Sequence, residues 1–246
     1  MRIEKNINYA SLSEKDYLDI YHPDKPNGDV IIHFHGGGLT SGRKEDVGDL
    51  PISFTNKGFT FVSVGYSLFP STDSHNPKFL IEASRAIAFT MLYLNNKHPY
   101  ISGQSAGSYI AMMLCFNKEY LSICGIDPLD IKGWFFESGQ PTTHFHLLEI
   151  QGENPWIQRI DEMAPLYYVG PQTKLSKALF ITYTNDMPSR VEQNRLMVST
   201  IRNFNKDAKV KEVLLEGNHC DGSSKKDIDG EYPYVKEVIK FIEEKI

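Results

Sequence analysis

Short apolar runs alternate with longer segments of helical character along the chain. Val30–Phe34 and Thr60–Val64 are mostly apolar and stop at a polar residue or a glycine, which is typical of short buried strands. Residues 16–21 alternate between polar and apolar positions, as a strand with one buried face does. Similar runs predict further strands at residues 100–102, 134–136, 179–183 and 210–215.

Four longer segments between these runs predict helices at residues 79–94, 108–116, 191–204 and 234–246. In the last segment, apolar residues such as Val235, Val238 and Ile242 recur at helical spacing. Strands that alternate with helices indicate an α/β fold, in which helices cover both faces of a mostly parallel sheet. Ligands of such sheets bind beyond the carboxyl ends of the strands, so residues that follow the predicted strands are the first candidates for a site.

Residues 141–171 interrupt this alternation and show no clear period, although they include His144, His146 and Trp156. We therefore expect one α/β domain over residues 1–246 with a small cap-like insertion at 141–171. This insertion would serve as a lid or a substrate pocket. A helical excursion that only packs against the sheet is an equally good interpretation.

Composition narrows the range of partners and compartments. The formal net charge of −5 does not favour nucleic acid or an anionic membrane surface as a partner. No stretch approaches the roughly 18 apolar residues of a membrane-spanning helix, and the first residues lack the apolar region of a secretory signal. The three cysteines are odd in number and show no Cys-x-x-Cys spacing, which favours a cytoplasmic location.

Two glycine-rich motifs follow predicted strands. His-Gly-Gly-Gly at residues 35–38 comes directly after Val30–Phe34, and Gly-Gln-Ser-Ala-Gly at residues 103–107 comes after residues 100–102. The second has the Gly-x-Ser-x-Gly pattern of a nucleophile elbow, and the first is typical of a loop that completes an oxyanion hole. Both motifs in this order arise by chance at most about once in a few thousand chains. Together they predict an acyl-transfer hydrolase.

Ser105 is the predicted nucleophile, because it lies at the tip of a sharp turn whose flanking glycines tolerate that conformation. We expect the backbone N–H groups of Gly37, Gly38 and Ala106 to form the oxyanion hole. Glycines let the backbone approach an oxyanion closely, and Ala106 stands where a helix begins. His35 is predicted to position this loop, because a histidine that precedes Ser105 is out of order for the base.

The hydroxyl of Ser105 needs a base, and the base needs an acid to orient it. His219 is the predicted base, since it lies on a loop between the last predicted strand and the final helix. Asp186 is the predicted acid, because it follows the strand at 179–183. Glu137, after the preceding strand, and Asp161, in the insertion, are the alternatives.

Other reactive side chains are assigned simpler roles. His144 and His146 have no cysteine or acidic partner at metal-ligand spacing, so neither a metal site nor a cofactor is expected. Cys220 stands beside His219 and is interpreted as a small packing residue.

These residues resemble the α/β-hydrolase superfamily, in particular the esterase branch related to hormone-sensitive lipase. The resemblance runs through residues 31–38, 63–70 and 103–107 to the Asp186 loop and His219. The Tyr-Ser-Leu-Phe-Pro segment at 66–70 is similar to the Tyr-Arg-Leu-Ala-Pro segment of that branch. The resemblance implies the α/β-hydrolase fold and a serine triad, whereas the substrate does not follow from it.

The chain also departs from this branch. Gly65, Ser67 and Ser108 stand where Asp, Arg and a second Gly are usual. The Met-Pro pair after Asp186 is closer to acetyl- and feruloyl-esterase-like members, and Leu39 replaces the aromatic residue of kynurenine-formamidase-like relatives.

We therefore expect a serine esterase that cleaves small or short-chain acyl esters through an acyl-enzyme intermediate, with a small-molecule ester as its partner. A carbohydrate acetyl or feruloyl esterase and an arylformamidase are the alternatives within hydrolases. A catalytically silent binding protein of the same fold is the alternative from another class.

Overall fold

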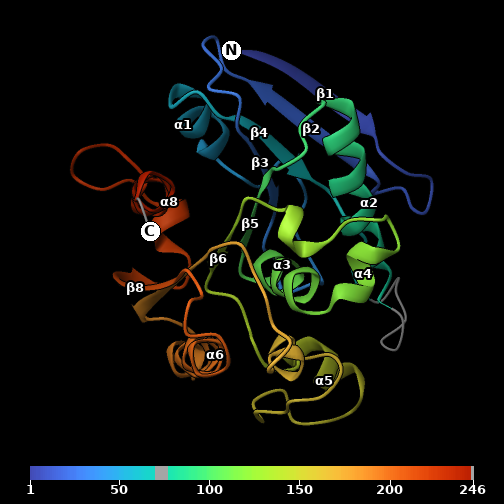
Figure 1. Ribbon diagram of the computed structural model, residues 1–246, viewed down its shortest axis with the longest axis vertical. Coiled ribbons are helices and arrows are strands. Elements are labelled where there is room, and N and C mark those ends of the chain that lie inside the picture. The colour runs from blue at the N-terminus through green and yellow to red at the C-terminus, as the bar shows by residue number, and fades with distance from the viewer. Residues whose placement is uncertain (70–76, 245–246) are drawn as a thin grey trace.

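One sheet of eight strands forms the centre of the computed structural model, which describes residues 1–69 and 77–244 (Figure 1). The strand order is β1-β2-β4-β3-β5-β6-β7-β8. Strands β1, β2 and β4 pair antiparallel, and the pairs from β4 through β3 to β8 are all parallel. The strands are β1 (Arg2–Asn8), β2 (Tyr17–His22), β3 (Val30–Phe34), β4 (Thr60–Val64), β5 (Tyr100–Gln104), β6 (Gly133–Glu137), β7 (Ala178–Asn185) and β8 (Val210–Asn218). The predicted mostly parallel sheet is confirmed.

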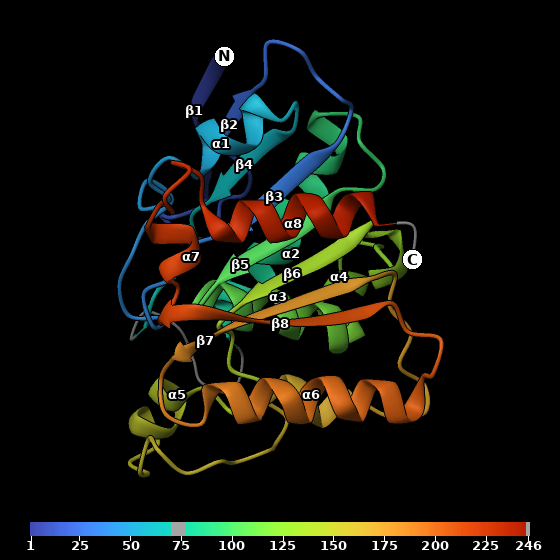
Figure 2. The same ribbon diagram turned by 90° about the vertical axis from the view of Figure 1, so that its left-hand side faces the viewer.

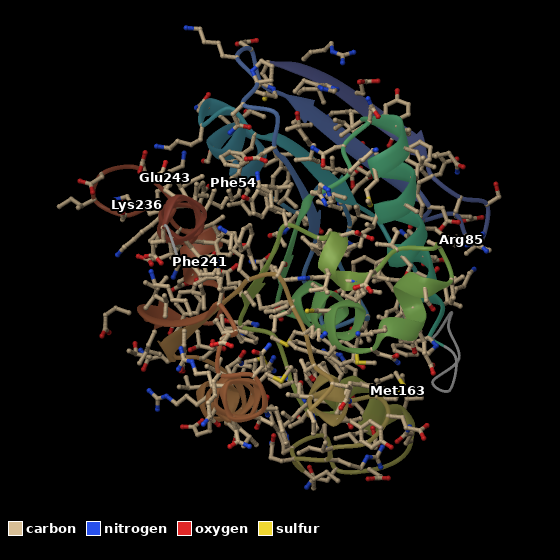
Figure 3. All side chains as sticks on the ribbon, in the orientation of Figure 1. Phe54, Arg85, Met163, Lys236, Phe241 and Glu243 are labelled. Atoms are coloured by element: carbon tan, nitrogen blue, oxygen red, sulfur yellow. The ribbon has the colours of Figure 1, made fainter. Side chains whose placement is uncertain are left out.

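Helices cover both faces of this sheet, as predicted. The helices are α1 (Leu50–Asn56), α2 (Lys78–Tyr93), α3 (Ala106–Phe116), α4 (Lys118–Ser122), α5 (Phe145–Ile150), α6 (Arg190–Phe204), α7 (Asp221–Ser224) and α8 (Pro233–Glu243), with 3-10 turns η1 (Pro128–Asp130) and η2 (Pro165–Tyr168). One core cluster joins the sheet to α2, α3 and α6. The other joins it to α1 and α8, which contribute Phe54 and Phe241 (Figure 3). Strand β8 therefore lies between α8 and α6 (Figures 1 and 2).

Two kinds of element differ from the sequence prediction. Strand β1 was not predicted, because most of its side chains are exposed and its sequence carries little apolar alternation. Its pairing with β2 includes an irregularity between Glu4 and Ile7, where Asn6 has a φ of 55°. Helices α1, α4, α5 and α7 are each at most seven residues long, too short for a periodic pattern to identify them. Pro70 of the 66–70 motif and residues 245–246 of the last predicted helix lie outside the described residues.

Residues 141–171 contain α5 and η2 and pack beside α3, where the Tyr109 hydroxyl donates to the Met163 carbonyl at 2.7 Å (Figure 3). Leu147 and Leu148 are fully buried, whereas Trp156 is 57% exposed. The segment is thus anchored on one side and open to solvent on the other, and a role as a lid stays a prediction. No helix among the described residues has the length and apolar character to cross a membrane.

The parallel strands bring distant parts of the chain to one edge of the sheet. Strands β3, β5, β6, β7 and β8 run in the same direction, so their carboxyl ends meet there. The residues at or just beyond those ends are His35, Ser105, Ser138, Asp186 and His219.

Candidate active site

A strained turn between β5 and α3 presents Ser105. Its φ of 52° and ψ of −113° lie outside the regions that non-glycine residues ordinarily occupy, a form of strain that clusters at functional sites. The glycines on either side have no room for a side chain. A Cβ on Gly103 would lie 2.3 Å from the Gly107 carbonyl oxygen, and one on Gly107 would lie 2.0 Å from that of Phe34. The N–H of Ser105 donates to the Glu137 carbonyl at 2.8 Å, which ties the turn to β6.

A hydrogen-bonded chain links the three predicted triad residues. His219 Nε2 lies 2.8 Å from Ser105 Oγ, and His219 Nδ1 lies 2.5 Å from Asp186 Oδ1. An ionised carboxylate only accepts hydrogen bonds, so Nδ1 carries the proton and Nε2 is left to accept the Ser105 hydroxyl. This arrangement can withdraw the serine proton and hold the resulting imidazolium against a carboxylate.

The Asp186 side chain is buried and well supplied with donors. Besides His219, the hydroxyl of Ser138 donates to Oδ2 at 2.6 Å and the N–H of Met187 to Oδ1 at 2.8 Å. Burial raises the pKa of Asp186, but the hydrogen bonds from His219 and Ser138 outweigh it and lower that pKa overall. Asp186 is therefore ionised at neutral pH.

The two alternative acids have other partners. Asp161 accepts a hydrogen bond from the Thr143 hydroxyl at 2.7 Å and forms an ion pair with Arg159 at 2.7 Å. Glu137 is fully buried and accepts hydrogen bonds from the Tyr183 hydroxyl and the Ser223 N–H. The structure thus pairs His219 with Asp186 and uses the alternatives elsewhere.

The glycine loop at 36–38 lies directly beside the nucleophile elbow. A Cβ built on Gly36 would lie 3.5 Å from Ser105 Cβ and 3.3 Å from the Gln104 carbonyl oxygen. Gly37 has a φ of +115°, and a Cβ there would lie 2.1 Å from the Ser41 carbonyl oxygen. Only glycine fits that position without moving the backbone.

Fixed peptide planes set the direction of the N–H groups in this loop. The Gly36 carbonyl accepts from His35 Nδ1 at 2.6 Å, and the Gly37 carbonyl accepts from the N–H and the hydroxyl of Ser41, both at 2.9 Å. In a trans peptide the C=O and the following N–H point in opposite directions. These bonds therefore hold the N–H groups of Gly37 and Gly38 on the opposite side of the loop from His35 and Ser41.

His35 is a neutral, buried part of this support. Its ring stacks on Tyr66 with the centroids 4.2 Å apart, and the Tyr66 hydroxyl donates to the His35 carbonyl at 2.6 Å. Burial lowers the pKa of His35 to about 4, so the imidazole is uncharged at neutral pH. This geometry agrees with the positioning role expected for His35.

The 141–171 segment reaches the same loop. His146 Nδ1 donates to the Gly38 carbonyl, and a Cβ on Gly38 would lie 2.7 Å from the imidazole Cε1 of His146. An open cavity of about 500 Å³ at the nucleophile is lined by residues that include Gly37, Ser105 and His219. Among the described residues, no cluster of three or more His, Cys, Asp or Glu side chains could hold a metal ion.

Sequence reasoning missed three supporting residues. Ser138 bonds to Asp186, and the buried Arg190 donates to the Ser138 carbonyl at 2.8 Å and to Gln140 Oε1 at 3.2 Å. His146 was considered only as a metal ligand. Ser138 left a readable signal, because it is a polar residue just beyond the carboxyl end of a predicted strand.

Comparison with known proteins agrees with this architecture. Residues 18–130 match the family model BD-FAE. Kynurenine formamidase of Danio rerio is 32% identical over 129 residues, which are 52% of this chain and 43% of that protein. The chain thus spans less than half the length of this relative.

Solved structures of esterases have the same fold at low sequence identity. Esterase 2 of Thermogutta terrifontis, phosphoramylated by tabun, superposes with a TM-score of 0.77 at 17% identity, over 98% of this chain and 93% of that one. Esterase B of Lactobacillus rhamnosis gives 0.76 at 16% identity, over 98% and 85% of the two chains. A truncated carbohydrate esterase from gut microbiota gives 0.76 at 17% identity, over 98% and 95%. The chain thus has the α/β-hydrolase fold of these esterases, and its residues 18–130 match the BD-FAE family model.

Proposed function

We propose that this protein is a serine hydrolase that cleaves carboxylic esters of small or short-chain acyl groups. The observation that carries the proposal is the hydrogen-bonded chain from Ser105 Oγ through His219 to Asp186, with separations of 2.8 Å and 2.5 Å. In this proposal Ser105 is the nucleophile, His219 the general base and Asp186 the acid that orients His219.

The proposed reaction has two acyl transfers. Ser105 Oγ attacks the ester carbonyl while His219 Nε2 takes its proton, and the carbonyl oxygen becomes an oxyanion. The N–H groups of Gly37, Gly38 and Ala106 stabilise this charge as it develops. The intermediate collapses, the C–O bond to the alcohol breaks, and His219 returns the proton to the departing alcohol. Water then attacks the acyl-Ser105 ester by the same route and releases the acid and free enzyme.

Arylformamide hydrolysis is the second candidate activity. It is supported by the similarity to a kynurenine formamidase over half of this chain. The same residues would serve, because a formamide carbonyl also passes through an oxyanion and its leaving amine also needs a proton from His219. Carbohydrate ester cleavage is supported by the carbohydrate esterase among the structural neighbours, and it would use the same serine mechanism.

The hydrogen-bonded triad favours an enzyme over a catalytically silent binding protein.

A serine-reactive fluorophosphonate tests the shared mechanism. We expect one covalent adduct on Ser105 by peptide mass spectrometry and none in Ser105→Ala. An unlabelled, folded wild-type protein would contradict the proposal. Rates on p-nitrophenyl acetate, longer p-nitrophenyl esters, acetylated sugars and N-formylkynurenine then separate the substrate classes. A kcat/KM that is highest for the formamide would replace the ester assignment with the second candidate.

We also propose a cytoplasmic location and a small-molecule substrate as the only partner the mechanism requires. The three cysteines Cys115, Cys124 and Cys220 are all free, which suits a reducing compartment. Fractionation of the source cells with an antibody against the protein tests the location, and recovery outside the cytoplasmic fraction would contradict it.

A further inference from the structure

A buried carboxyl group that the proposed mechanism does not use lies behind the base. Glu137 ends β6, and its side chain is fully buried. Its Oε1 accepts two hydrogen bonds, one from the Tyr183 hydroxyl on β7 and one from the Ser223 N–H on α7 at 3.1 Å. Helix α7 begins at Asp221, two residues after His219.

Tyr183, which is hydrogen-bonded to Glu137, also binds a second backbone N–H of α7. The N–H of Gly222 donates to the Tyr183 hydroxyl at 3.0 Å, so Tyr183 passes the anchoring from Glu137 to Gly222. There is no room for a side chain there, because a Cβ on Gly222 would lie 2.3 Å from that hydroxyl oxygen. The N–H groups in the first turn of a helix have no acceptor within the helix. Here Tyr183 and Glu137 supply the acceptors for two of them.

The anchoring extends to the nucleophile turn. Gln104, which precedes Ser105, donates from Nε2 to the Ser223 hydroxyl at 2.7 Å. The Glu137 carbonyl accepts the N–H of Ser105 at 2.8 Å. Glu137 therefore contacts the nucleophile through its backbone and the helix after the base through its side chain.

The link from α7 to His219 is short and stiff. Cys220, the single residue between His219 and the helix, has a φ of 59°, and the Ser224 hydroxyl donates to its carbonyl at 2.8 Å. A shift of α7 is therefore passed directly to the imidazole. A displacement of about 1 Å at a catalytic group can cost on the order of a hundredfold in rate.

We propose that Glu137 is a positioning residue for the catalytic base, which holds His219 in line with Ser105 by anchoring, together with Tyr183, the N–H groups of Gly222 and Ser223 in α7. This inference rests on the proposed serine-hydrolase function. It assigns Glu137 a purpose other than that of the triad acid.

The two carboxyl oxygens of Glu137 differ, and this makes a sharp test available. Oε1 accepts both anchoring bonds, whereas Oε2 is buried and has no hydrogen-bond partner among the described residues. Glu137→Gln can place its amide oxygen at Oε1 and keep both bonds. Glu137→Met has a similar length but offers no comparable acceptor. Comparing these two variants separates the effect of losing the anchoring hydrogen bonds from the effect of changing the size of the side chain.

Fluorophosphonate labelling rates and steady-state kinetics are measured on wild type, both Glu137 variants and Phe61→Leu. The last variant removes buried volume on β4 and controls for lost stability alone. We expect Glu137→Met to label roughly 10–100-fold more slowly and to lose kcat with KM nearly unchanged. Glu137→Gln should stay within about threefold of wild type, and Phe61→Leu should match wild type at 25 °C.

Amide hydrogen exchange of Gly222 and Ser223 gives a readout that does not depend on activity. It should be slow in wild type and Glu137→Gln and fast in Glu137→Met. Wild-type labelling or slow exchange in Glu137→Met would overturn the inference, and so would a Gln variant as impaired as the Met variant. A wild-type protein that exchanges slowly at these amides but does not label would contradict the proposed function and leave the anchoring intact.

Discussion

His35 Nδ1 donates to the carbonyl oxygen of Gly36 at 2.6 Å, within the loop that lies beside Ser105. Through the peptide that joins Gly36 to Gly37, this bond sets the direction of the Gly37 N–H. A buried side chain thereby determines the direction of a predicted oxyanion donor. Because His35 is neutral at pH 7, this support does not change over the physiological range.

Replacing His35 by Phe should lower kcat by about 10–100-fold with little change in KM, because donor alignment matters most in the transition state. Phenylalanine keeps the stacking on Tyr66 but cannot donate to Gly36. Steady-state kinetics on p-nitrophenyl acetate measure the effect. A His35→Phe enzyme with wild-type kcat would show that the glycine loop holds its shape without this bond.

Replacing Ser138 by Ala removes a hydrogen bond of 2.6 Å to Asp186. Since that bond lowers the pKa of Asp186, the variant carboxyl should titrate at higher pH and kcat/KM should fall by about tenfold. The measurement is kcat/KM as a function of pH. Thr182→Val is the matched control, because the buried Thr182 hydroxyl on β7 has no partner among the described residues. Equal losses in the two variants would argue against a specific role for Ser138.

His146 joins the 141–171 segment to the glycine loop through the Gly38 carbonyl. His146→Phe should therefore release this contact, make residues 141–171 more sensitive to limited proteolysis, and lower kcat by roughly threefold or more. Glu149→Gln is the control, because Glu149 approaches only the outer nitrogen of His146, at 3.7 Å. If proteolysis and kcat both stay at wild-type values in His146→Phe, the segment does not depend on this contact.

Stability should depend on pH through Glu137. Burial raises the pKa of this carboxyl from 4.5 to about 7, against the opposing effect of hydrogen bonds from Ser223 and Tyr183. A raised folded-state pKa means stability that is complete below the unfolded pKa and is lost as the pH rises through the folded one. Ionisation of Glu137 should thus reduce the free energy of unfolding by up to about 3 kcal/mol between pH 4.5 and 8.

Two buried histidines affect the pH dependence of stability in the opposite direction over part of this pH range. Burial lowers the pKa of His33 to about 3 and that of His35 to about 4, so their contribution to stability falls as the pH drops below 6.5. The informative quantity is therefore the difference in unfolding free energy between wild type and Glu137→Gln, measured by urea titration at each pH. This difference should fall as the pH rises from about 4.5 and level off above about 7, and a difference that is constant with pH would contradict the prediction.

Much of the fold could be predicted because the patterns that indicate its strands and motifs lie within short stretches of sequence. Val30–Phe34 and Thr60–Val64 were predicted with the bounds the structure gives, since a short, mostly apolar run can be recognised from the five residues alone. The order Ser105, Asp186, His219 followed from a motif and from the places where strands end. Strand β1 was missed because its stability comes from pairing with β2, and a short-window pattern contains no information about a partner strand.

The sequence alone determined the fold class, the nucleophile turn and the candidates for base and acid, because periodicity and motif spacing are properties of neighbouring residues. The tertiary structure decided which carboxyl faces His219, since Asp186 and Glu137 both follow strands predicted from the sequence and their three-dimensional surroundings distinguish them. It also decided the supporting contacts, such as His146 to Gly38, which join residues 108 positions apart. Contacts of that separation depend on how the elements pack, which no local pattern encodes.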